Sequence, residues 1–159
     1  MKKVTGFTLI ELLVVVGIVS SVFLFGVVAY RDFSRRQQLS ETARQVRQDL
    51  LLAQQRALSG EKSVCQNPQT NSLVGYMVVF SSTSYQVVAD CFTGQDPLVK
   101  DVKLGGLVSK TGGSSSVTFK ILAQGTTDVG DQSIVLTHSL TSKTATVTIS
   151  KTGSVSISF

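Results

Sequence analysis

The sequence predicts an α+β fold, in which one long N-terminal helix packs on an antiparallel β domain. Three observations support this prediction. The run from Phe7 to Tyr30 contains a single charged residue and no proline, and the run from Ser34 to Leu58 contains neither proline nor glycine. Beyond Gly60 the composition changes to Ser, Thr, Val and Gly, in short runs of alternating polarity. We therefore expect four segments, with bounds 1–6, 7–30, 31–60 and 61–159.

Composition limits the functions that the chain can perform. Its 159 residues suffice for one domain with an appendage. The formal net charge is +5, and all six arginines lie between Arg31 and Arg56. Because most of this positive excess lies in the segment 31–60 and the excess is small elsewhere, the basic balance alone does not indicate a nucleic-acid partner. One histidine and two cysteines provide little material for catalysis, so we expect no enzyme activity, no cofactor and no metal site.

The apolar segment 7–30 is long enough to cross a membrane. Its 24 residues would form a helix of roughly 36 Å, against a hydrocarbon core of about 30 Å. A secretory signal peptide is the alternative, with a small-residue cleavage site at 27–29. Against it, the run is longer than a signal-peptide core and contains Glu11, a charge that is costly in lipid and indicates a cationic partner.

The residues around Glu11 form a recognisable motif. The sequence Gly6-Phe7-Thr8-Leu9-Ile10-Glu11-Leu12, after a short basic leader, resembles the signal of type IV prepilins and type II secretion pseudopilins. The resemblance implies cleavage by a prepilin peptidase after Gly6 and N-methylation of Phe7. It also implies that Glu11 pairs with the terminal amine of a neighbouring subunit. It further implies a single-pass protein of the bacterial inner membrane, with an extracytoplasmic C-terminal domain, that later joins a filament.

The segment 31–60 has the pattern of an amphipathic helix. Apolar residues recur at spacings of three and four, which predicts one buried stripe: Leu39, Ala43, Val46, Leu50, Ala53 and Ala57. Gly60 is expected to end the helix. Most of the arginines lie off the stripe. They would either form a solvated face with local pairs or contact lipid headgroups and neighbouring subunits.

The segment 61–159 is predicted to form an antiparallel β-sheet or β-sandwich. Expected strands are Gly75–Phe80, Ser84–Ala89, Leu98–Leu104, Ser116–Leu122, Ser133–His138, Thr144–Ser150 and Ser154–Phe159. The order of elements resembles H-type pseudopilins and the FimT and FimU minor pilins. Members of that group proposed to bind DNA carry arginines where this chain has Ser154 and Ser156. We therefore do not expect a nucleic-acid partner.

The remaining candidate residues have simple interpretations. Cys65 and Cys91 would face an oxidising compartment, so we expect a disulfide that ties the loop 61–74 to the sheet, with two free buried thiols as the alternative. His138 is expected at the surface or on an edge strand. The glycine-rich run 110–116 lacks the end of a phosphate-binding loop and is expected to be a flexible hairpin tip.

The resemblance implies a structural subunit, a minor pilin or a pseudopilin. The expected partners are a prepilin peptidase and methylase, other pilins or pseudopilins, and membrane lipid before assembly. Major pilins usually carry a proline near position 28, where this chain has Val28, and this difference favours a minor pilin or a pseudopilin. The alternative is a secreted or membrane-anchored β-sandwich binding module with a conventional signal peptide.

Overall fold

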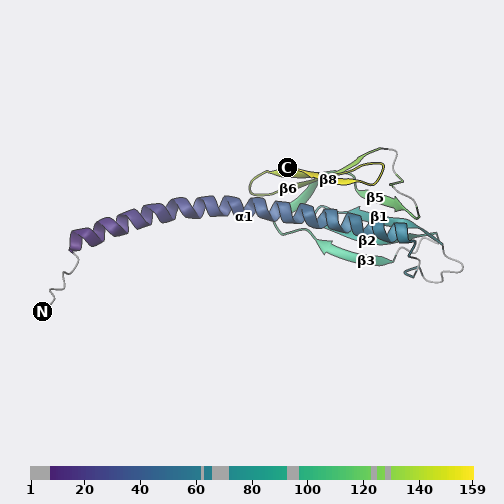
Figure 1. Ribbon diagram of the computed structural model, residues 1–159, viewed down its shortest axis with the longest axis horizontal. Helices are drawn as coiled ribbons and strands as arrows, with labels where there is room; N and C mark the ends of the chain where they lie inside the picture. The colour runs from purple at the N-terminus through teal and green to yellow at the C-terminus, as the bar shows by residue number, and fades with distance from the viewer. Residues whose placement is uncertain (1–7, 62, 66–71, 93–96, 123–124, 128–129) are drawn as a thin grey trace. The chain divides into compact units, whose positions relative to one another are not determined.

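A computed structural model of the chain (Figure 1) describes the backbone of residues 8–61, 63–65, 72–92, 97–122, 125–127 and 130–159. Within these ranges it describes all side chains except those of residues 24–26, 28 and 29. The helix is α1, Leu9–Ser59. The strands are β1 Leu73–Phe80, β2 Ser84–Cys91, β3 Leu98–Lys103, β4 Val108–Gly113, β5 Ser116–Lys120, β6 Gln132–His138, β7 Thr144–Ile149 and β8 Val155–Ser158. The α+β class is confirmed.

The chain divides into two compact units, residues 1–36 and residues 37–159. In the first unit, every described large apolar side chain between Leu9 and Phe33 is more than half exposed. Charged residues are sparse there, so this surface offers mainly hydrocarbon to its surroundings. None of the helices in the described part of the chain combines the length and mean apolarity of a membrane span.

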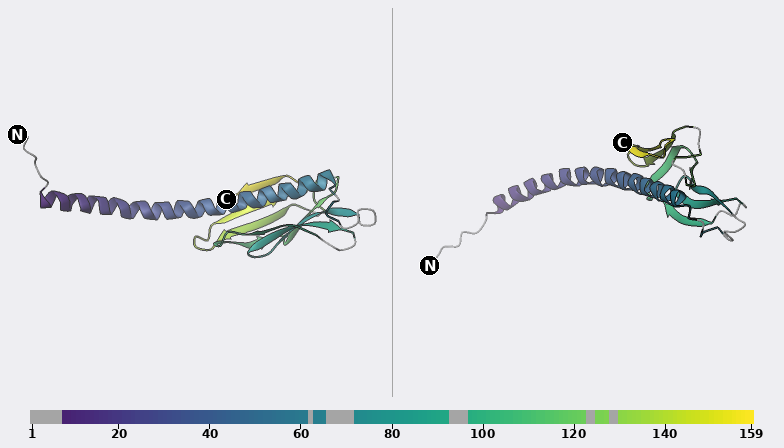
Figure 2. Two further views of the ribbon diagram at one scale, coloured as in Figure 1. Left: turned by 90° about the horizontal axis from the view of Figure 1, so that it is seen from below. Right: turned by 45° about the vertical axis from the view of Figure 1, so that its right-hand side comes forward.

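In the second unit, the C-terminal half of α1 lies across two four-stranded antiparallel sheets (Figure 2). The strand orders are β3-β2-β1-β5 and β4-β6-β7-β8. The predicted helical stripe is confirmed, because its six residues are between 0 and 3% exposed. They join side chains from both sheets in one hydrophobic core, including Val78 and Phe119 from one sheet and Ile134 and Val147 from the other.

The helix ends at Ser59, directly before Gly60, as the sequence predicts. Gly60 has a φ of 62°, the left-handed conformation that ends many helices. Its N–H donates to the carbonyl of Ala57 at 3.1 Å, and the N–H of Glu61 donates to the carbonyl of Arg56 at 3.4 Å. A side chain at position 60 would be strained by the positive φ and would also approach Leu122.

The glycine-rich run 110–116 was wrongly expected to be a flexible tip. Residues Val108–Gly113 form β4, which pairs with β6 and contains a bulge between Lys110 and Gly112. Gly113 has a φ of 84°, and a side chain there would collide with the carbonyl of Ser133. These glycines therefore permit a bulge and a close approach of two backbones, which are common uses of glycine within sheets.

His138 was wrongly expected at the surface or on an edge. It lies at the end of β6, between β4 and β7, and its side chain is fully buried. It faces the core side of its strand, as Ile134 and Leu136 do. Its Nδ1 accepts a hydrogen bond of 3.3 Å from the N–H of Leu140, so the imidazole helps to hold the turn between β6 and β7.

Candidate functional site

Glu11 lies in the first turn of α1, and its side chain is exposed. Among the residues that the structure describes, the carboxylate has no hydrogen-bond or ion-pair partner. Gly6 and Phe7, the other two predicted processing and assembly residues, lie outside the described residues. The site therefore shows one unpaired acidic side chain within an apolar helical surface.

Thr8 caps the helix that carries Glu11. Its Oγ1 accepts a hydrogen bond of 3.4 Å from the Glu11 N–H, and its carbonyl accepts one of 3.2 Å from the Leu12 N–H. The order Thr-x-x-Glu is the sequence of a capping box, and an acid in the first turn complements the helix dipole. This local role was not predicted from the sequence, although the spacing of Thr8 and Glu11 indicates it.

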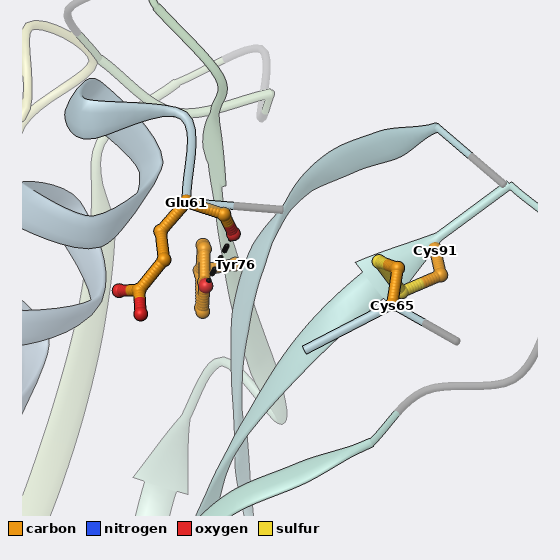
Figure 3. Close-up of a disulfide and its surroundings, with 4 residues drawn as sticks. All are labelled: Glu61, Cys65, Tyr76 and Cys91. Atoms are coloured by element: carbon orange, nitrogen blue, oxygen red, sulfur yellow. Dashed lines mark hydrogen bonds between the residues drawn. A yellow bond between two sulfur atoms is a disulfide. The ribbon is translucent and has the colours of Figure 1, made fainter. Parts of the chain in front are cut away.

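Cys65 and Cys91 form a disulfide bond, with an S–S distance of 2.01 Å and a Cα–Cα distance of 6.1 Å (Figure 3). Cys65 follows the end of α1, and Cys91 is the last residue of β2. Both side chains are buried. The bond therefore joins the segment after the helix to the sheet that the helix covers.

A hydrogen bond close to the disulfide joins the same two parts of the fold (Figure 3). The hydroxyl of Tyr76, on β1, donates to the carbonyl of Glu61 at 2.9 Å. Burial raises the pKa of Tyr76 above its ordinary value, and the negative charge of Glu61 raises it further. The phenol thus stays protonated and remains a donor through the neutral range.

A buried carboxylate that was not predicted from the sequence lies in the helix–sheet interface. Asp49 is 4% exposed on α1. The Tyr85 hydroxyl donates to its Oδ2 at 2.6 Å, and the Lys100 ammonium donates to its Oδ1, also at 2.6 Å. Burial raises the pKa of Tyr85, and its hydrogen bond to the charged Asp49 adds to the rise. The network links α1 to β2 and β3, and both carboxylate oxygens are occupied.

A second polar contact links α1 to the other sheet. The Nε of Arg47 donates to the carbonyl of Val155 on β8 at 3.1 Å. Arg47 therefore contributes to the attachment of β8, whereas Arg35 pairs locally with Asp32 at 3.4 Å. The two interpretations of the arginine face, solvation and intermolecular contact, did not include this intramolecular role.

A helix packed on antiparallel sheets in this way is the arrangement typical of type IV pilins. Residues 1–28 match the family described as the prokaryotic N-terminal methylation motif, which is the type IV prepilin-type signal. The chain therefore carries a prepilin-type signal at the start of a pilin-like fold, which suggests a structural subunit rather than an enzyme. No curated protein and no solved structure matches the chain.

Proposed function

We propose that this protein is a minor pilin or pseudopilin, processed after Gly6 and N-methylated at Phe7. It is assembled through its N-terminal helix into a type IV pilus or a type II secretion pseudopilus. Such a filament serves protein secretion, motility, adhesion or DNA uptake. The observation that carries the proposal is the match of residues 1–28 to the methylation motif, a range that contains Gly6, Phe7 and Glu11.

Before assembly, the segment 7–30 would hold the protein in the inner membrane, with the β domain on the extracytoplasmic side. The exposed apolar side chains of this segment support this role, since water disfavours such a surface. In the filament, the same surface would be buried against neighbouring subunits. The same apolar surface would thus be covered first by lipid and later by neighbouring subunits.

Glu11 would set the position of each subunit in the filament. A carboxylate within an apolar environment is costly unless a cation pairs with it. Cleavage after Gly6 creates a new amine at Phe7, and the amine of a neighbouring subunit supplies that cation. The pair would select one position of each subunit along the filament, because a neighbour displaced from that position would leave both charges unpaired.

The disulfide fits a β domain that folds outside the cytoplasm, where disulfides form and persist. It would keep the end of α1 joined to the sheet. The boundaries of the proposed functional segments remain 1–6 for the leader, 7–30 for the assembly helix, 31–60 for the amphipathic helix and 61–159 for the β domain.

Processing is tested by expressing the full chain in membranes with and without a prepilin peptidase and reading the N-terminus by mass spectrometry. We expect N-methyl-Phe7 only when the enzyme is present. Gly6→Val should abolish cleavage, whereas Gly17→Val, at a position with open space around it, should leave cleavage unchanged. A terminus near Tyr30, independent of the peptidase, would instead support the signal-peptide alternative and refute the proposal.

Assembly is tested separately with Glu11→Gln in cells that make the complete filament. We expect the variant to be cleaved normally but to be depleted at least tenfold from the sheared filament fraction. Glu41→Gln is the matched control, because it removes an exposed carboxylate from the same helix. Equal incorporation of the two variants would show that Glu11 has no role in assembly.

A further inference from the structure

The outer face of the sheet β4-β6-β7-β8 consists almost entirely of hydroxyl side chains. Ile134, Leu136, Val147 and Ile149 point into the core, so the residues that alternate with them lie on the opposite face. Gly112, which pairs with Val135, also lies on this face but has no side chain. Ten side chains lie there, nine placed by the strand register and Thr111 placed by its hydrogen bond with Thr137: Ser109, Thr111, Ser133, Val135, Thr137, Thr144, Thr146, Thr148, Ser156 and Ser158. All of them except Val135 are serine or threonine.

This hydroxyl face is accessible and uncharged. Each of its ten residues is exposed or half-buried, and none carries a charge or an aromatic ring. The outer face of the other sheet differs, because Asp101, Lys103 and Lys120 lie there with Met77 and Val79. The hydroxyl face is thus uncharged, in contrast to the outer face of the other sheet, although the chain has a net charge of +5.

The hydroxyls form a two-dimensional grid. Neighbouring strands lie about 4.8 Å apart, and alternate side chains along one strand are separated by about 6.8 Å. The Thr111 and Thr137 hydroxyls already pair across two strands, with their Oγ1 atoms 2.7 Å apart. Each hydroxyl can both donate and accept a hydrogen bond. The grid therefore suits a partner that also presents repeated groups able to donate and accept.

We propose that the hydroxyl face binds a neutral, insoluble polysaccharide, whose packed chains present rows of hydroxyl groups. An anionic polymer would require Lys or Arg on the face, and a hydrophobic partner would require exposed apolar side chains. One hydrogen bond contributes only about 1 kcal/mol net. Binding therefore depends on many contacts made together on an extended surface, which selects a solid polymer over a free sugar.

The proposal is tested by co-sedimentation of the full chain, in mild detergent, with microcrystalline cellulose. We expect adsorption that stays within twofold when salt is raised from about 0.1 M to about 1 M, since no charge pairs are involved. Thr146→Lys, at the centre of the face, should weaken adsorption at least tenfold. Thr118→Lys adds the same charge to the outer face of the other sheet and should leave adsorption unchanged.

Ser156→Lys provides a second variant at an exposed position, in case Thr146→Lys fails to fold. Circular dichroism and thermal melting identify which variants are folded. Absence of wild-type adsorption would overturn the proposal, as would equal weakening by Thr118→Lys or loss of adsorption at high salt. The experiment needs neither cleavage at Gly6 nor a filament, so its result is independent of the proposed function.

Discussion

Asp49 lies on the core-facing side of α1, and two different strands occupy its two carboxylate oxygens. A buried carboxylate is costly when its partners are removed, because the remaining groups keep the cost of burial without the bond. Lys100 retains access to water, with 41% of its side chain exposed, whereas the side chain of Asp49 is 6% exposed. The stability that this network provides therefore depends more on Asp49 than on Lys100.

For this reason, Asp49→Asn should lower the free energy of unfolding by about 1–3 kcal/mol. The amide can still accept from Tyr85, but it loses the charge that pairs with Lys100. Urea denaturation of the full chain in detergent measures the change. Glu41→Gln on the same helix should stay within about 0.5 kcal/mol of the wild type. Equal effects of the two substitutions would contradict the role assigned to Asp49.

Tyr85 predicts a dependence of stability on alkaline pH. The folded state raises the pKa of Tyr85 above its ordinary value of 10.0. Above pH 10 the unfolded chain releases this proton while the folded chain keeps it, so the free energy of unfolding falls as pH rises. Tyr85→Phe should be less stable at pH 7 but should lose stability less steeply above pH 10. Parallel curves from thermal melting across pH 9–11 would refute this prediction.

At the scale of elements, the fold depends on the fit between one helix stripe and two sheets. The stripe combines the large side chains of Leu39, Val46 and Leu50 with three alanines, and all six are buried. Small residues allow the helix to approach the sheets, and the larger ones fill the space between them. The polar contacts of Asp49 and Arg47 flank this apolar contact and reach opposite sheets.

A pair of leucine substitutions tests the stripe. Leu50→Ala should lower the free energy of unfolding by about 2–5 kcal/mol, because it leaves a cavity in the core. Leu58→Ala makes the same change in the same helix at a side chain that is 37% exposed, and it should cost less than half as much. Both variants are measured by urea denaturation. Similar losses would show that the stripe is not the main contact.

At the scale of the whole molecule, the disulfide constrains the segment that joins the helix to the sheets. The bonded cysteines are 26 residues apart, and closing a loop of that length stabilises the folded state by roughly 3–4 kcal/mol in the chain-entropy description. Reductant should therefore lower the melting temperature of the wild type. It should not affect the double variant Cys65→Ser/Cys91→Ser, which serves as the control. An unchanged wild-type melting temperature would contradict this prediction.

The helix, most strands and the prepilin-type signal were predictable from the sequence because each depends on local order. Apolar residues at spacings of three and four define the buried stripe. Gly60 ends the helix regardless of what the helix packs against. Alternation located seven of the eight strands within the described residues, with small differences at their ends. Phe7 and Gly6 were singled out by their distance from Glu11, which is also a local pattern.

Long-range contacts were not predictable from local order. The strand β4 was missed because glycine usually marks a turn. Gly113 is instead explained by its positive φ and by the carbonyl of Ser133 across the sheet. His138 was misplaced because its burial depends on strands that lie on both sides of it. The position of Asp49 on the apolar side of the helix could be read from the sequence. The identity of its partners could not.

The sequence by itself thus determined the signal, the helix and its buried stripe, because residues close together in the chain specify them. Only the tertiary structure decided which strands are neighbours, which charges meet at Asp49 and which hydroxyls share one face. Contacts of this kind join residues far apart in the chain, such as Arg47 and Val155, which are 108 positions apart. No local pattern encodes such a pairing, since it is the packing of the whole core that brings the two residues together.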